Sequence, residues 1–228
     1  MGLFDIFKKK NTNVEMGENQ ANLNNNMSPV QNTIPNGVDT NFTEMSKNIQ
    51  NDVVETELDE IDKILDQIYP TKKDITVNDS ILKRISVYSQ NYYWHFVTHG
   101  LKDKYQMELT FKLKMNDNIN DDKEINCVCE ILKLLSRIIE EKNEAFVTSQ
   151  YIRTNNAISM DADSKSNITG FITIDEPLIN DIPILDTKIK LIEIIGATDM
   201  ELKSIIDNQM TVDDLYKKLG TDITDYNR

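Results

Sequence analysis

Few residues of this chain could take part in chemistry. The 228 residues include two histidines, His95 and His99, and two cysteines. Histidines four positions apart on a helix share a face and could bind zinc. However, the glutamate of a His-Glu-x-x-His site is missing here, and the local composition favours a β-strand. We therefore expect structural, hydrogen-bonding roles for both imidazoles.

The cysteines and carboxylates do not form a catalytic pattern. Cys127 and Cys129 are two residues apart and would point to different faces of a helix, so we expect buried thiols and no zinc site. Neighbouring acids such as Asp161 and Asp163 are common on any acidic surface, and the seven glycines form no phosphate-binding loop. The sequence predicts a protein without enzymatic activity, cofactor or metal.

The elements that would position these residues centre on residues 92–115. Residues 107–115 alternate strictly between apolar and polar side chains, which predicts a strand with one face on a core and the other in water. Residues 92–98 are an aromatic and β-branched run that Gly100 ends. Together they predict the nucleus of a sheet, with a short reversal at residues 100–106.

Apolar residues at helical spacing predict helices on either side of this nucleus. The first covers residues 54–68 and ends before Pro70. The second, at residues 128–139, should cover the sheet. Two shorter helices should begin at the N-caps Thr198 and Thr211.

Further short strands are expected along the chain, whereas residues 72–84 look like a polar connector. The last of these strands is apolar on both faces, which suits the centre of a sheet. The fold class is therefore α+β: a mixed, largely antiparallel β-sheet covered by α-helices. The expected strands are residues 85–88, 151–153, 158–160, 168–174 and 188–195.

The beginning of the chain has a different character. Residues 1–10 form a short amphipathic segment that could contact a membrane or a partner weakly, and they are similar to the start of membrane-active frog peptides. Residues 11–45 are rich in asparagine and predict a disordered linker, which leaves residues 46–228 for the folded domain. The predicted membrane-contact residues are Leu3, Phe4, Ile6, Phe7, Lys8, Lys9 and Lys10.

Three motifs resemble the suppressor-of-fused family. Residues 94–101 read Trp-His-Phe-Val-Thr-His-Gly-Leu and residues 108–113 read Glu-Leu-Thr-Phe-Lys-Leu. Residues 190–202 are similar to a later strand and helix start of the family, and residues 224–228 to its closing Thr-Asp-x-x-Arg. The resemblance covers residues 55–228. It implies a non-enzymatic protein-binding domain, whose single-domain bacterial relatives look like immunity proteins against toxins.

Charge and composition agree with a protein partner. The net charge is −13, and residues 51–228 carry 33 acidic and 21 basic side chains. An acidic domain repels nucleic acid and attracts basic proteins, although acidity also simply keeps a protein soluble. The chain has no disulfide framework, secretory signal or bilayer-spanning apolar run, which predicts a cytoplasmic location.

We therefore predict a bacterial immunity-type protein that sequesters or neutralises a partner protein, which could be a basic toxin. The alternative is a membrane-peripheral adaptor tethered by residues 1–10. Tyr105 is a predicted partner contact, because the family places an aromatic residue there beside the partner groove; packing is its alternative role. Asp161 and Asp163, in a polar turn, are predicted contacts at the rim.

Overall fold

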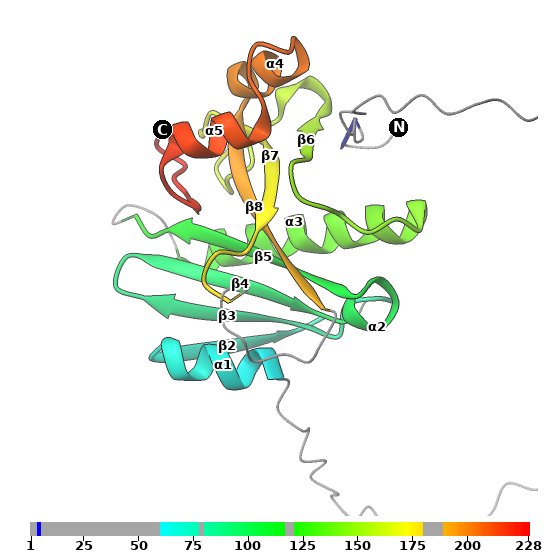
Figure 1. The fold of residues 1–228 in the computed structure, drawn as a ribbon. Helices are drawn as coiled ribbons and strands as arrows, with labels where there is room; N and C mark the ends of the chain where they lie inside the picture. Colours follow the sequence, from blue (N-terminus) through cyan, green and yellow to red (C-terminus); the bar gives the residue numbers. More distant parts are fainter. Residues whose placement is uncertain (1–3, 6–59, 78–79, 117–120, 180–188) are drawn as a thin grey trace, which may run out of the picture. The chain divides into compact units, whose positions relative to one another are not determined.

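A mixed β-sheet organises the part of the chain that the computed structural model describes, namely residues 4–5, 60–77, 80–116, 121–179 and 189–228. Its strands are β1 (Phe4–Asp5), β2 (Thr71–Thr76), β3 (Arg84–Gln90), β4 (Tyr93–His99), β5 (Met107–Lys114), β6 (Tyr151–Thr154), β7 (Ile168–Asp175), β8 (Lys190–Thr198) and β9 (Ile223–Thr224). They lie in the order β1-β6-β7-β8-β5-β4-β3-β2, with β9 paired to β5 (Figure 1). β5 runs parallel to β8 and β9, and the other pairs are antiparallel. The predicted fold class is confirmed.

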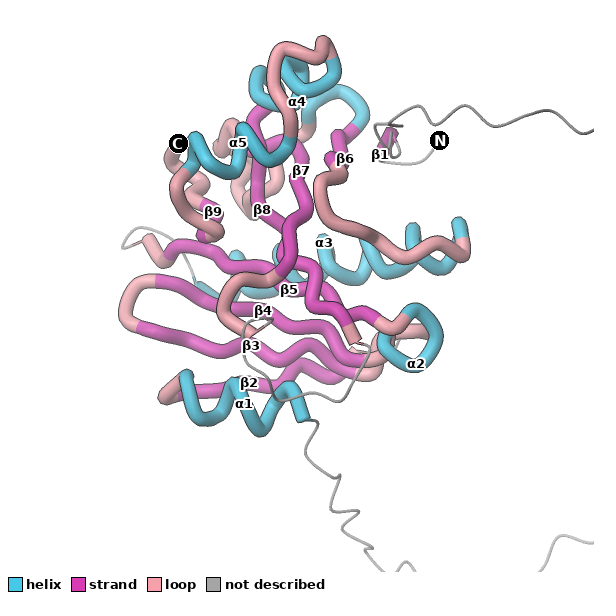
Figure 2. Tube along the Cα trace, viewed as in Figure 1, coloured by secondary structure: helices cyan, strands magenta, loops and turns pink. Residues whose placement is uncertain are grey.

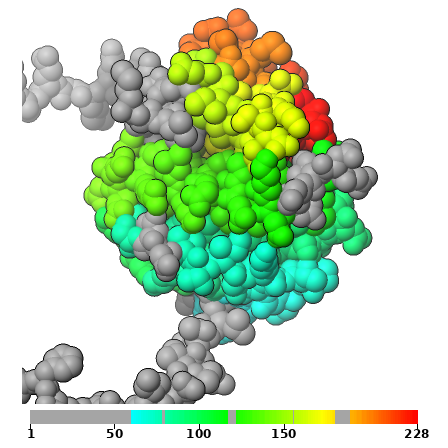
Figure 3. Space-filling model, turned by 180° about the vertical axis from the view of Figure 1, so that it is seen from behind, coloured from blue at the N-terminus to red at the C-terminus, as the bar shows by residue number. Residues whose placement is uncertain are grey.

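Helices cover both faces of this sheet (Figure 2). They are α1 (Glu60–Ile68), α2 (Lys102–Tyr105), α3 (Asp121–Lys142), α4 (Asp199–Ile206) and α5 (Val212–Leu219), with a short 3-10 turn at Asn155–Ala157. α3 packs on one face, where Val128 and Leu132 join the core around Phe96 and Phe111. Seen from behind, α3 crosses the middle of the surface (Figure 3).

The opposite face is covered in two parts. α1 packs Ile61 and Leu65 against Tyr88 of β3 and Val97 of β4. α4 and α5 pack against β7 and β8 in a separate apolar cluster that includes Ile195. The polar middle of the sheet, on β4, β5 and β8, lies between these two apolar clusters.

β5 shows where the sequence-based expectation was wrong. The alternation is present, and Leu109, Phe111 and Leu113 face α3. However, the polar face of the strand is buried too, since Thr110 is 0% and Lys112 3% exposed. Alternation identifies the two faces of a strand but not what covers each face.

Two local expectations need correction. The polar connector contains the strand β2, whose side chains are mostly exposed because it lies at the edge of the sheet. Residues 158–160 form no strand; they follow the 3-10 turn, and Met160 bonds to Ile168 through its backbone.

At the N-terminus the structure describes only Phe4–Asp5, which form β1 and pair with β6, so these two residues are not helical. The rest of the amphipathic segment and the whole linker at residues 11–45 lie outside the described residues. The proposed domain boundaries therefore remain predictions.

The ends of helices α4 and α5 lie at the capping residues that the sequence predicted or at a glycine. Thr198 and Thr211 both form capping boxes, the first with Glu201 and the second with Asp214. Gly220 ends α5 in the left-handed conformation, at φ 67°. Among the described residues, none of the helices has the length and hydropathy of a membrane-spanning segment.

Candidate functional site

The polar middle of the sheet is a buried cluster centred on Lys112. The strand register places His95 opposite Lys112, and Thr110 beside Glu193 of β8. Two more acids come from connecting segments: Glu176 directly follows β7, and Asp222 precedes β9. We refer to His95, Lys112, Glu176, Glu193 and Asp222 as the Lys112 cluster.

The ammonium group of Lys112 holds the cluster together. Its Nζ lies 2.6 Å from Oε1 of Glu176, 2.5 Å from Oδ2 of Asp222 and 3.8 Å from Oε2 of Glu193. Burial by itself would lower the pKa of Lys112, but the three carboxyl groups outweigh burial and raise this pKa above its ordinary value. Lys112 is therefore a permanent cation in the core.

Glu193 is surrounded by hydrogen-bond donors and yet favours its neutral form. Its Oε1 accepts from the backbone N–H of Lys112 at 2.9 Å, and its Oε2 from the hydroxyl of Thr110 at 2.6 Å. Complete burial raises the pKa of Glu193 to about 8, because desolvation exceeds the opposing effect of Lys112. At neutral pH this carboxyl group mostly carries a proton.

His95 is oriented by one ring nitrogen and leaves the other unpaired. Nδ1 lies 2.8 Å from the hydroxyl of Tyr69, which lies 3.2 Å from that of Tyr93. Nε2 faces Oε2 of Glu193 at 3.9 Å and has no hydrogen-bond partner among the described residues. Burial, together with the nearby Lys112 charge, lowers the pKa of His95 well below its ordinary value, so the imidazole is neutral.

The second histidine belongs to a different cluster, built around Asp62 of α1. Nε2 of His99 lies 3.0 Å from the hydroxyl of Ser86 and 3.6 Å from Oδ1 of Asp62. The fully buried Asp62 also pairs with Arg84 and accepts from the hydroxyl of Tyr88 at 2.6 Å. Burial would raise the pKa of Asp62, but these partners lower it overall. The Asp62 cluster joins α1 to β3 and β4. The imidazoles of His95 and His99 thus belong to two separate clusters.

An open pocket leads to the Lys112 cluster. It has a volume of about 290 Å³ and exposes part of Lys112 and Asp222. Tyr92, at its rim, is 56% exposed. The pocket combines apolar, aromatic and charged surface, which are the features that ligand sites share. It is lined by Tyr92, Tyr93, Lys112, Pro177, Leu178, Asp222 and Ile223.

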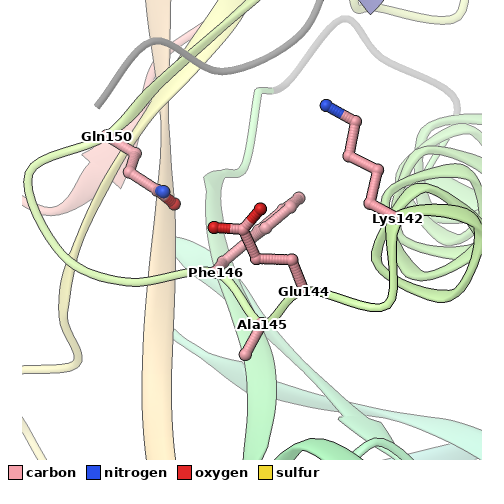
Figure 4. A pocket seen from close by; sticks show the side chains of 5 residues that line it. All are labelled: Lys142, Glu144, Ala145, Phe146 and Gln150. Carbon is pink, nitrogen blue, oxygen red and sulfur yellow. The ribbon is translucent and has the colours of Figure 1, made fainter. Parts of the chain in front are cut away.

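A second depression, between the end of α3 and the start of β6, has no comparable space (Figure 4). Its accessible volume is about 0 Å³. One of its polar groups, the side-chain oxygen of Gln150, already accepts a hydrogen bond from the backbone N–H of Val147 at 3.0 Å. It is therefore a closed corner of the fold and offers no room for a ligand.

The predicted contact residues lie away from this pocket. Tyr105 ends α2 and is half-buried against the core that includes α3; its buried hydroxyl has no hydrogen-bond partner among the described residues. Asp161 closes a turn by accepting from the backbone of Lys165 and Ser166, at 2.9 Å each. Asp163, in the same turn, is exposed and pairs with lysine side chains. The structure thus joins the two aspartates in one turn, while Tyr105 lies on another element.

Four members of the Lys112 cluster were not predicted from the sequence, namely Lys112, which was expected to face water, and Glu176, Glu193 and Asp222. One of them left a signal, because Glu193 is the single charged residue within the apolar run 191–197 of a predicted central strand. A charge in such a strand must be paired or neutralised. Glu176 and Asp222 lie in connecting segments, where acids are ordinary.

Comparisons with known proteins agree with this architecture. The family described as Suppressor of fused protein (SUFU) matches residues 81–228. The Sufu–Fu complex structure is similar with a TM-score of 0.57 and 18% identity, over 73% of this chain and 88% of that chain. A search of curated proteins finds no match.

Two further solved structures share the fold. Drosophila Suppressor of Fused matches with a TM-score of 0.56 and 16% identity over 73% of this chain, which spans about half, 49%, of that protein. A suppressor of fused homologue from Neisseria gonorrhoeae gives 0.52 and 15%, over 69% of this chain and 86% of that chain. The sequence motifs, the mixed sheet and the match over residues 81–228 lead to one conclusion: this chain belongs to the suppressor of fused family.

Proposed function

We propose that this chain is a non-catalytic protein-binding domain that sequesters or neutralises a basic partner protein, in the manner of a bacterial immunity protein. The observation that carries the proposal is the edge strand β2. Among the described residues β2 pairs with β3 alone. Its other side offers backbone groups to which an extended partner segment could be added as a strand.

The side chains of β2 suit selective pairing. Lys73 and Asp74 are exposed on the strand. Charged residues on an edge strand discourage indiscriminate strand addition, so a partner must match them. The Sufu–Fu structure is itself that of a complex with another protein, which supports a protein partner for this member of the family.

The charge of the chain supports a basic partner. A net charge of −13 creates a negative field that accelerates the encounter with a positively charged protein and slows the encounter with an acidic one. Immunity proteins need fast association, because the toxin must be captured before it reaches its target.

The test is binding of the full chain to the purified product of the neighbouring reading frame. We expect the association rate constant to fall about tenfold or more from low to physiological salt, because the attraction between opposite charges is screened. Amide hydrogen exchange should slow in β2 on binding. Salt-independent association would remove the electrostatic part of the proposal, and unchanged exchange in β2 would remove strand addition.

A membrane-peripheral adaptor is the second candidate. It is favoured by the apolar residues Leu3, Ile6 and Phe7 beside the three lysines at residues 8–10. Flotation with anionic liposomes separates the two candidates, comparing the full chain with one that starts at Thr43. Equal flotation of the two chains would eliminate the tether.

A further inference from the structure

Three buried side chains of the Lys112 cluster converge on one point. His95, Glu176 and Glu193 each offer a ligand atom, and these three atoms lie within 4.8 Å of one another. They come from β4, from the residue after β7 and from β8, and all three are fully buried. Buried convergence of this kind is unlike the acidic neighbours of an exposed surface, which are separated by water.

The unpaired nitrogen of His95 points into this group. Because the Tyr69 hydroxyl can accept a hydrogen bond from Nδ1–H, the ring can hold its proton on Nδ1 and present the lone pair of Nε2 toward Glu193. A metal-binding histidine is held in the same way, with one nitrogen on the metal and the other hydrogen-bonded to an oxygen. No group among the described residues forms a hydrogen bond with Nε2 of His95.

The charge balance of the cluster leaves room for a second cation beside Lys112. Glu176, Glu193 and Asp222 carry three negative charges when ionised, and Lys112 supplies one positive charge. A divalent ion that displaces the proton of Glu193 would bring the sum to zero, and Lys112 could stay on Glu176 and Asp222 beside it. A buried group of charges is stable when its members are paired and neutralised in this way.

From these observations we propose that His95, Glu176 and Glu193 bind one divalent transition-metal ion of the Zn²⁺ type. An imidazole with two carboxylates suits zinc, whereas calcium and magnesium prefer oxygen ligands alone. These three ligands leave the fourth position of a tetrahedral zinc site, which a water molecule would fill. The ion joins β4, β8 and the segment after β7, and the site is independent of the partner-binding edge at β2.

The experiment uses the untagged full chain, freed of metal with a chelator and titrated with Co²⁺, which gives visible absorption in such a site, and with Zn²⁺ by calorimetry. We expect one ion per chain. His95→Gln and Glu193→Gln should each weaken binding about 100-fold or more, because each removes a ligand. Tyr69→Phe should weaken it about 10- to 100-fold by releasing Nδ1. His99→Gln is the matched control and should bind like the wild type.

A measurement on the wild type keeps the proposal testable if a variant fails to fold. The chain has two imidazoles, whose ¹⁵N signals can be resolved and assigned with His99→Gln. Zn²⁺ should move the Nε2 signal of His95 alone, and Mg²⁺ should move neither. Absence of stoichiometric binding, a shift at His99, or a folded His95→Gln or Glu193→Gln chain with wild-type affinity would overturn the site.

Discussion

At the scale of single residues, the spacing of side chains predicted the roles of the two histidines but not the burial of Lys112. The hydrogen-bonding role expected for His95 and His99 is present, because aromatic and β-branched neighbours placed both in a strand. The burial of Lys112 was not foreseen. Its partners Glu176 and Asp222 lie 64 and 110 positions further along the chain. No local pattern contains such contacts.

The raised pKa of Glu193 gives a pH dependence of stability. Its folded pKa of about 8 lies above the ordinary value of 4.5, so between these pH values the folded chain holds a proton that the unfolded chain has lost. The contribution of Glu193 to the free energy of unfolding is therefore lost as pH rises through this window. The metal-free Glu193→Gln variant has no such group to titrate. Its free energy of unfolding, relative to that of the metal-free wild type, should therefore increase from pH 5 to about pH 8.

Urea unfolding of both proteins at several pH values measures this difference. Circular dichroism at each pH first establishes that the variant is folded. Parallel stability curves for the two proteins would show that Glu193 titrates alike in the folded and unfolded chains.

At the scale of elements, the helices and paired strands were easier to predict than the edges. α3 and the capping boxes of α4 and α5 carry their signals within a few residues. β2 carries no such signal, because an edge strand with mostly exposed side chains needs no apolar alternation. Residues 158–160 were wrongly predicted as a strand. Met160 is buried, but Ile158, two positions before it and on the same face of such a strand, is 40% exposed.

The reversal after β4 should be sensitive to an added methyl group. Gly100 has φ of 139°, and a Cβ there would collide with the backbone carbonyl of Ile81. We expect Gly100→Ala to lower the free energy of unfolding by about 2–4 kcal/mol.

Gly220→Ala is the matched control, because Gly220 also has a positive φ but open space around it. Its cost should be about 1 kcal/mol, from backbone strain alone. Urea unfolding of the two variants gives both values. Equal losses would show that the close approach to Ile81 contributes nothing.

At the scale of the whole molecule, the fold class followed from the order of the predicted elements and is confirmed. The short reversal predicted at residues 100–106 joins the antiparallel pair β4 and β5, and the two-sided apolar strand β8 does lie in the interior of the sheet. The candidate site could hardly be predicted from the sequence. The pocket beside Lys112 is made by segments around residues 92, 112, 177 and 222, which only the completed sheet brings together. The predicted contacts Tyr105, Asp161 and Asp163 remain predictions.

The stability of the folded body should depend little on the start of the chain. The described members of the three apolar clusters all lie between Ile61 and Tyr226. Of the structure that is described, a chain starting at Thr43 loses the two-residue strand β1 and no member of these clusters. We expect its free energy of unfolding in urea to lie within about 1 kcal/mol of the full-length value. A larger loss would show that the first residues contribute to the core.

The parallel pairing of β5 with β8 has a consequence for how the chain reaches its native state. β3, β4 and β5 are neighbours in sequence and can assemble early, whereas Thr110 and Glu193 meet across 83 residues. Closing so long a loop costs entropy before any contact repays it, and folding slows as the sequence separation of contacts grows. We therefore expect the docking of β8 on β5 to come late in folding, because this step carries Lys112 and Glu193 out of water and lets Glu193 take up a proton.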